Sequence, residues 1–257
     1  NYQLYGISID GTNLLPLTAF EGVRTMIIDD LPEIESEVIV GLNKRNPRIF
    51  DPYRLNIENG KLTILAENPG NIQGWMTDHN GKLRVAKALD GVNQSLLYRD
   101  NEDAPFKRVI TTSFKESLSP FVFTEDNLKL YAMSNLGRDK SALVIFNPKT
   151  GQEEKFLYEN SSYDISGIAY SKKEKDLKGV SYMAHDGLKR YFFDEDWKNM
   201  FSKIEKRVNN TPFGLVDITK DEDKMIVVAY SDKSPGNYYL YDVKTDSVAV
   251  NENYVVK

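Results

Sequence analysis

The chain has 257 residues, of which 40% are hydrophobic, and a formal net charge of -5 at pH 7. This composition supports a large buried core and excludes a disordered chain, while the mixing of acidic and basic residues excludes a basic stripe for nucleic acid. No apolar run approaches the length of a membrane helix, so we expect a soluble protein without a membrane span, in the cytoplasm or the periplasm.

The first strand-like segment, residues 2–20 (YQLYGISIDGTNLLPLTAF), matches only the second half of a unit that recurs along the chain, with Asp10-Gly11 at its turn. The chain opens on Asn1 inside this pattern, so we expect the natural start to lie upstream. Five whole units follow, and we place their boundaries at 23–68, 71–113, 117–160, 164–209 and 212–250.

The units repeat at a nearly constant interval. Gly74, Pro120, Gly167 and Gly214 occupy equivalent positions, and the steps between them are 46, 47 and 47 residues. Each unit reads as two hairpins, and four strands per unit at this period are typical of a β-propeller blade. A β-sandwich is the alternative, but it does not require a fixed period. We predict an all-β propeller with about five and a half blades in one partial domain, from a seven-bladed parent.

One unit departs from the pattern near residues 195–208. Trp197, Phe201, Ile204 and Val208 are spaced 4, 3 and 4 residues apart, behind an acidic start at 194–196. This spacing predicts a short amphipathic helix in the place of an outer strand, and an acidic start favours a helix N-terminus. We expect its apolar face to pack on a blade edge; a helix that binds a partner is the alternative.

The residues indicate no catalytic centre. The nucleophile-elbow pattern G-x-S-x-G does not occur, and the nearest piece, around Ser181, lacks the second glycine. The chain has no cysteine, and its two histidines, His79 and His185, stand beside turn residues without the clustering that zinc needs. No calcium loop, phosphate loop or dinucleotide fingerprint is present. We predict no catalytic residue, no metal and no cofactor.

Four segments together carry a resemblance: VGLNKRNPRIFDPYRLNIENGKL (40–62), NPGNIQGWMTDHNGKLRVA (68–86), SNLGRDKSALVIFNPKTG (134–151) and YSDKSPGNYYLYDVKTD (230–246). They resemble the N-terminal propeller of prolyl oligopeptidase family serine peptidases, in the dipeptidyl aminopeptidase and acylaminoacyl peptidase branch, over residues 2–250. In that family an α/β-hydrolase domain with the Ser, Asp and His follows the propeller, and these 257 residues contain no such domain.

The resemblance implies that the chain is the non-catalytic, substrate-gating propeller of a serine peptidase that hydrolyses oligopeptides. Its partners would be the C-terminal hydrolase domain of the parent and peptide substrates. The alternative is a free-standing propeller that serves as a binding platform for a protein or a glycan.

Topology predicts which loops would face an appended domain. In a four-stranded meander, the chain leaves the fourth strand at the end of the sheet that carries the loop between strands two and three. The charged or polar candidates in these loops are Arg45, Arg48, Arg138, Asp139, His185 and Asp232. Among them, Arg138 is the strongest candidate for orienting a peptide terminus, because a guanidinium can bind a carboxylate with two hydrogen bonds. The alternative is that Arg138 and Asp139 satisfy one another.

Overall fold

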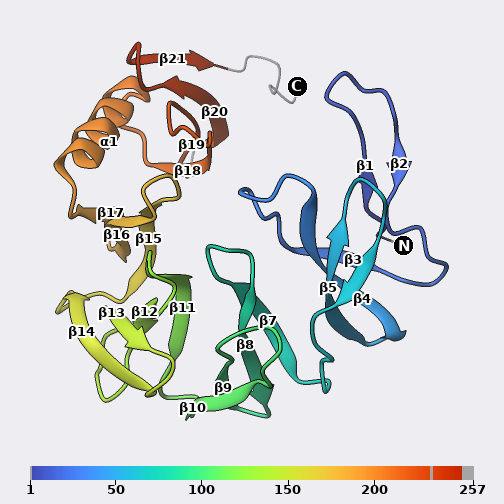
Figure 1. The fold of residues 1–257 in the computed structure, drawn as a ribbon. Coiled ribbons are helices and arrows are strands. Elements are labelled where there is room, and N and C mark those ends of the chain that lie inside the picture. Colours follow the sequence, from blue (N-terminus) through green and yellow to red (C-terminus); the bar gives the residue numbers. More distant parts are fainter. Residues whose placement is uncertain (1, 232–233, 251–257) are drawn as a thin grey trace. The chain divides into compact units, whose positions relative to one another are not determined.

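The computed structural model describes residues 2–231 and 234–250 (Figure 1). The described chain is built of antiparallel β-sheets with one α-helix. It divides into two compact units: unit 1 comprises residues 1–137 and 145–155, and unit 2 comprises residues 138–144 and those from 156 onward.

The first sheets lie in unit 1. A two-stranded sheet pairs β1 (Tyr5–Gly6) with β2 (Leu15–Pro16). Two four-stranded meanders follow it in chain order: β3 (Thr25–Asp29), β4 (Glu37–Asn46), β5 (Ile49–Asn56) and β6 (Leu62–Ile64), then β7 (Ile72–Thr77), β8 (Leu83–Asp90), β9 (Asn93–Tyr98) and β10 (Lys107–Thr112). The next meander is β11 (Leu118–Phe123), β12 (Leu130–Ser134), β13 (Ala142–Asn147) and β14 (Gln152–Tyr158), of which residues 142–144 and 156–158 belong to unit 2.

Unit 2 contains the remaining elements. A three-stranded sheet of β15 (Ile165–Ser171), β16 (Asp176–Ala184) and β17 (Gly187–Phe192) is followed by α1 (Glu195–Arg207). The last sheet is a complete meander of β18 (Phe213–Ile218), β19 (Lys224–Ser231), β20 (Ser234–Asp242) and β21 (Ser247–Val250). The predicted fold class, an all-β propeller of antiparallel blades with one short inserted helix, is confirmed.

The small residues that mark the repeat lie at or beside irregularities of the first strands. The strand register shifts between Ile72 and Gly74, between Pro120 and Val122, and between Ile165 and Gly167. The residues left out of the ladder are Gln73, Phe121 and Ser166, each next to a marker residue, and the marker residues themselves stay paired with the second strand. A bulge close to the marker residue therefore recurs in these first strands, although its exact position varies.

Helix α1 forms where the sequence predicts it, for two reasons. Asp194 has an extended backbone, and its carboxylate accepts a hydrogen bond from the Trp197 backbone N–H at 2.9 Å, which caps the helix. Trp197, Phe201 and Ile204 are buried against β18, β19 and β20, where they meet a core that includes Phe213. The helix thus packs its apolar face inward, as expected.

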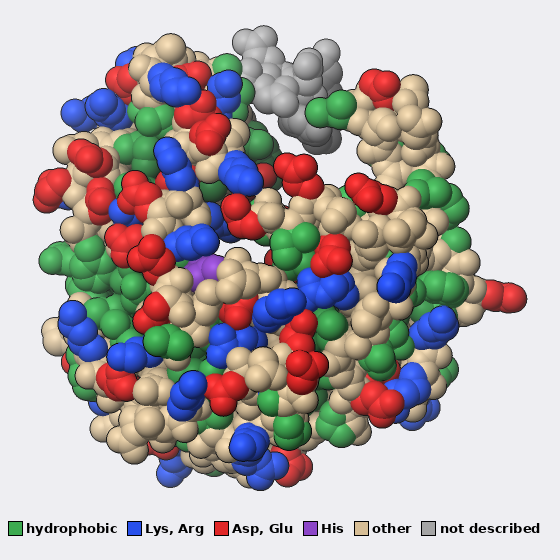
Figure 2. All heavy atoms as spheres, in the orientation of Figure 1, with side chains coloured by type: hydrophobic (Ala, Val, Ile, Leu, Met, Phe, Trp, Pro, Cys, Tyr) green, Lys and Arg blue, Asp and Glu red, His purple; other side chains and the backbone are tan. Residues whose placement is uncertain are grey.

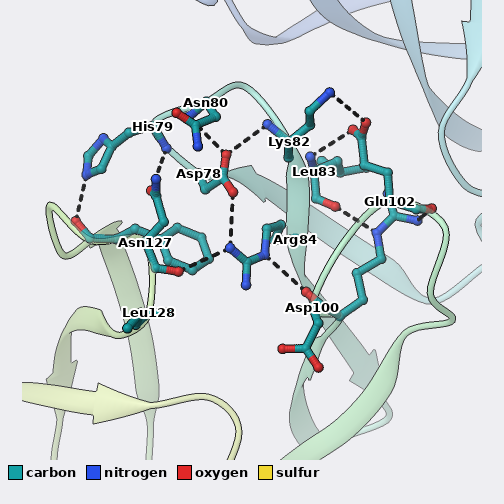
Figure 3. A network of polar contacts seen from close by, with 12 residues as sticks. Asp78, His79, Asn80, Lys82, Leu83, Arg84, Asp100, Glu102, Asn127 and Leu128 are labelled. Carbon is teal, nitrogen blue, oxygen red and sulfur yellow. Dashed lines mark hydrogen bonds and ion pairs between the residues drawn. The ribbon is translucent and has the colours of Figure 1, made fainter.

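A buried polar network joins neighbouring sheets within unit 1 (Figure 3). The Arg84 guanidinium donates to the Asp78 carboxylate at 3.1 Å, to the Asn127 carbonyl at 3.1 Å and to the Tyr98 hydroxyl. Both charged side chains are nearly inaccessible, at 9% for Arg84 and 4% for Asp78. Because Asn127 lies in the turn between β11 and β12, the network fastens that turn to the β7–β8 hairpin. His79, one of the two histidines of the chain, lies beside this network, and its Nε2 forms a hydrogen bond with the Phe123 carbonyl at 3.0 Å.

Candidate functional site

The two candidates of unit 1 lie where β4 turns into β5: Arg45 near the end of β4 and Arg48 in the turn. The Arg45 guanidinium donates two hydrogen bonds to the Asp51 carboxylate, at 3.0 and 2.9 Å, and one to the Asn68 carbonyl at 2.7 Å. Asp51 is fully buried and also accepts from the Asn68 backbone N–H. Arg45 is therefore held by its own hairpin. Arg48 is exposed, and its backbone N–H closes the turn on the Asn46 side chain at 3.0 Å.

The loop between β12 and β13 presents Arg138 and Asp139, which belong to unit 2. The Arg138 guanidinium lies over the Phe156 ring at 4.7 Å from the centroid, and Phe156 is 54% exposed. A guanidinium stacked in this way keeps a defined orientation, because the ring attracts the cation and restricts the side chain. Asp139 is highly exposed and forms an ion pair with Lys140 at 3.1 Å.

The loop between β16 and β17 carries His185, which lies at one end of a group of tyrosines. The His185 ring meets Tyr163 edge to face at 5.6 Å. Tyr163 stacks on Tyr182 at 5.8 Å, and Tyr158 stacks on the same ring at 6.4 Å. Tyr191 contacts Tyr158 at 4.9 Å. We call Tyr158, Tyr163, Tyr182 and Tyr191 the tyrosine cluster.

Burial raises the pKa of the Tyr182 phenol, and the neighbouring Tyr158 raises it further, so the Tyr182 hydroxyl stays uncharged near neutral pH. Asp186, beside His185, binds Lys189 at 2.6 Å, and this hydrogen bond lowers the pKa of the Asp186 carboxyl. The loop and the tyrosine cluster beside it thus offer phenol hydroxyls, an exposed imidazole and a carboxylate paired with a lysine.

The tyrosine cluster was not predicted from the sequence. Its members come from the end of β14, the following connection, β16 and β17, so no fixed spacing relates them. The sixth candidate, Asp232, lies outside the described residues. Arg45 and Arg48 are placed within unit 1, whereas Arg138, Asp139 and His185 are placed within unit 2. The assignment of these residues to a binding site stays a prediction.

A separate cavity of about 750 Å³ lies in unit 2, between α1 and the turns of the last sheet. Its floor includes Met200 and Met225, and its rim carries charges that partly neutralise one another: Lys244 binds Asp223 at 2.9 Å. The cavity adjoins the turn between β18 and β19, so it lies at the end of that sheet opposite to the candidate loops.

No acidic or histidine cluster suited to a metal occurs among residues 2–231 and 234–250. Lysine, arginine, aspartate and glutamate side chains are interspersed over the face in Figure 2. Within the described residues, no helix has the length and apolar character needed to cross a membrane.

Comparison with known proteins gives these features a context. No family model matches the chain. It is 26% identical over 256 residues to dipeptidyl aminopeptidase BIII of Pseudoxanthomonas mexicana, across 94% of this chain and 35% of that protein. Over nearly its whole length, the chain is therefore similar to about a third of a dipeptidyl aminopeptidase.

A second curated relative and a solved structure match a similar extent of the chain. Dipeptidyl peptidase family member 6 of Caenorhabditis elegans is 23% identical across 94% of this chain and 34% of its own length. A solved prolyl endopeptidase structure shares the fold, with a TM-score of 0.57 and 13% identity, across 96% of this chain and 41% of that one. This chain thus spans about a third of the length of the two curated relatives.

Proposed function

We propose that the chain is the non-catalytic, substrate-gating propeller of a serine peptidase that hydrolyses oligopeptides. The observation that carries this proposal is the match of nearly the whole chain to about a third of a dipeptidyl aminopeptidase. A fold alone does not fix a function, so the peptidase assignment depends on that sequence relationship rather than on the propeller. The hydrolysing residues would belong to an α/β-hydrolase domain elsewhere in the parent protein.

Within this function, the candidate loops would face the hydrolase domain and the peptides that reach it. Arg138 supports this role best among the candidates, because its guanidinium is oriented by Phe156 at a partly exposed position. A planar cation held there can pair with a peptide carboxylate. His185 and the hydroxyls of the tyrosine cluster add hydrogen-bonding groups at the equivalent end of the next sheet.

The test is a charge reversal in the whole peptidase. We expect Arg138→Glu to lower kcat/KM for oligopeptides about tenfold, a loss of about 1.4 kcal/mol of transition-state binding, mainly through KM. Lys203→Glu is the matched control, because Lys203 lies on α1 at the rim of the separate cavity, and this variant should cleave like the parent. Unchanged cleavage of short and long peptides by Arg138→Glu would remove Arg138 from the site.

The peptidase assignment has its own test. A serine-directed organophosphorus reagent should label the whole protein and abolish hydrolysis of dipeptidyl and acylaminoacyl substrates. A gate further requires that kcat/KM falls steeply as peptides lengthen. Binding of a protein or a glycan without labelling or hydrolysis would instead support the free-standing binding platform.

A further inference from the structure

We propose that β17 is an interaction surface at which two copies of the protein pair edge to edge, as antiparallel strands centred on Tyr191. This inference is independent of the peptidase assignment. It follows from an unpaired strand edge, the aromatic side chains beside it and the charges along it.

The edge is open because α1 replaces a strand. In the other meanders the third strand pairs with a fourth, as β20 does with β21. The sheet of β15, β16 and β17 has three strands, and within the described residues no strand lies along the outer side of β17. The chain turns into α1 instead, and α1 packs through Phe201 against the Phe192 ring.

The register identifies the backbone groups that face outward. The Phe193 N–H donates to the Lys178 carbonyl at 2.8 Å, and Tyr191 lies opposite Val180. Inward hydrogen bonds recur at every second residue of an antiparallel strand. The odd-numbered residues of β17 therefore bond to β16, and residues 188, 190 and 192 direct their N–H and C=O groups outward. Such a row is a template for another strand.

Exposed aromatic rings lie beside this row. Tyr191 is 49% exposed and Phe193 is 40% exposed, and their rings meet edge to face at 5.5 Å. The charged residues of β17 do not shield the edge. Lys189 binds Asp186, and the Arg190 guanidinium lies over the Phe213 ring at 4.6 Å, on the opposite face of the sheet. Burial also lowers the pKa of Arg190.

The sequence of β17 selects the register of a pair of copies. A two-fold axis at Lys189 would place the two copies of Lys189 opposite each other, and an axis at Arg190 would do the same for Arg190. Both registers are unfavourable, because like charges in direct opposition destabilise a sheet. An axis at Tyr191 sets Tyr191 against Tyr191, Arg190 against Phe192 and Lys189 against Phe193. Only favourable cross-strand pairs result.

An axis at Leu188 also avoids like charges, but it leaves Phe193 beyond the paired segment. An axis at Phe192 would draw Asp194 into the paired strand, although Asp194 caps α1. Of the remaining axes, the one at Tyr191 brings both exposed rings into the contact, so it removes the most apolar surface from water. The occupant that fits the edge is thus a second copy of the same strand, in one defined register.

A single cysteine tests the register directly, because the 257 residues contain none. Tyr191 would occupy a non-hydrogen-bonded pair position, where facing Cα atoms are about 4.5 Å apart, which a disulfide can span. We expect Tyr191→Cys to form a covalent dimer under mild oxidation. Tyr230→Cys, at a position of similar exposure (44%) on β19, should not form one at the same concentration. Equal cross-linking of the two variants would overturn the proposal.

A second variant measures the association without a cross-link. Tyr191→Lys sets lysine against lysine on the axis, and sedimentation equilibrium should show the dimer dissociation constant raised about tenfold or more, whereas Tyr230→Lys should leave it unchanged. A monomeric parent protein, or a Tyr191→Lys protein that dimerises like the parent, would refute the pairing. Circular dichroism checks that each variant is folded, and if Tyr191→Lys is not, the cysteine experiment decides.

Discussion

One backbone conformation recurs at the blade period in the turn between the first and second strands. Gly81, Asn127, Lys175 and Glu222 all have positive φ, at 69°, 58°, 52° and 59°. Glycine and asparagine adopt this region at little cost, whereas a lysine suffers a contact between its Cβ and the backbone. The Glu222 carboxylate accepts a hydrogen bond from the Ser171 hydroxyl at 2.9 Å, which offsets this cost, whereas the Lys175 side chain forms no hydrogen bond within residues 2–231 and 234–250.

Lys175→Gly should therefore stabilise the fold. Relief of the left-handed strain is worth about 1–2 kcal/mol, and the extra entropy of glycine in the unfolded chain offsets about 0.5–1 kcal/mol of it. We expect the free energy of unfolding in urea to rise by roughly 0.5 kcal/mol. Lys172→Gly, three residues earlier and without a positive φ, should lower it. Equal effects of the two substitutions would contradict the strain argument.

At the scale of the element, α1 shows what a spacing can and cannot predict. The 4, 3, 4 spacing of apolar residues and the acidic start predicted the helix and its buried face. The ionic contacts at its start were not predicted. Lys178 on β16 binds Asp194, which caps α1, at 3.2 Å and Asp176 at 3.4 Å, and it also binds Glu174. Burial opposes the charged amine, yet these three carboxylates together raise the pKa of Lys178.

Asp194 gives the helix a measurable pH dependence. Its hydrogen bond from the Trp197 backbone lowers the pKa of the Asp194 carboxyl, and the bond from Lys178 lowers it further. A carboxyl with a lowered folded-state pKa stabilises the fold at pH values above its unfolded pKa, and this contribution is lost as the pH falls through the folded pKa. Asp194→Ala should cost about 1 kcal/mol at pH 7, and the difference from the parent should shrink toward pH 3.

The matched control is Asp194→Asn, because asparagine also caps helices well but carries no charge for Lys178. It should lose less stability than Asp194→Ala at pH 7. Urea unfolding at pH 7, 5 and 3 measures both variants. A cost of Asp194→Ala that stays constant over this range would show that the charge of the carboxylate is irrelevant to the cap.

At the scale of the whole molecule, the sequence predicted what repeats and missed what does not. The period of 46 to 47 residues indicated the blades because each repeats the same succession of hairpins. The tyrosine cluster and the Arg84 network have no period, since their members meet only when separate hairpins pack together. The candidate loops were deduced from topology alone, and the structure shows that Arg45 is held by Asp51, a residue that no motif had marked.

The Arg84 network offers a decisive test of how hairpins of different sheets are fastened in unit 1. Arg84→Met removes the partner of the buried Asp78 carboxylate and leaves the Asn127 carbonyl without its donor. Removing one member of a buried ion pair costs about 3–5 kcal/mol, because the other charge stays desolvated. We expect the urea midpoint to fall accordingly. Lys82→Met, whose lysine is 54% exposed and 3.7 Å from Glu102, should change stability by less than about 0.5 kcal/mol.

A second substitution separates the charge from the packing. Asp78→Asn on the Arg84→Met background removes the unpaired charge, while the remaining amide oxygen can still accept from the Asn80 and Lys82 backbone N–H groups, which bind the carboxylate at 3.0 Å. Part of the lost stability should therefore return, and the two substitutions should be non-additive, as expected for residues in contact. Additive costs, or an Arg84→Met cost no larger than that of Lys82→Met, would mean that the apolar cores alone hold these hairpins together.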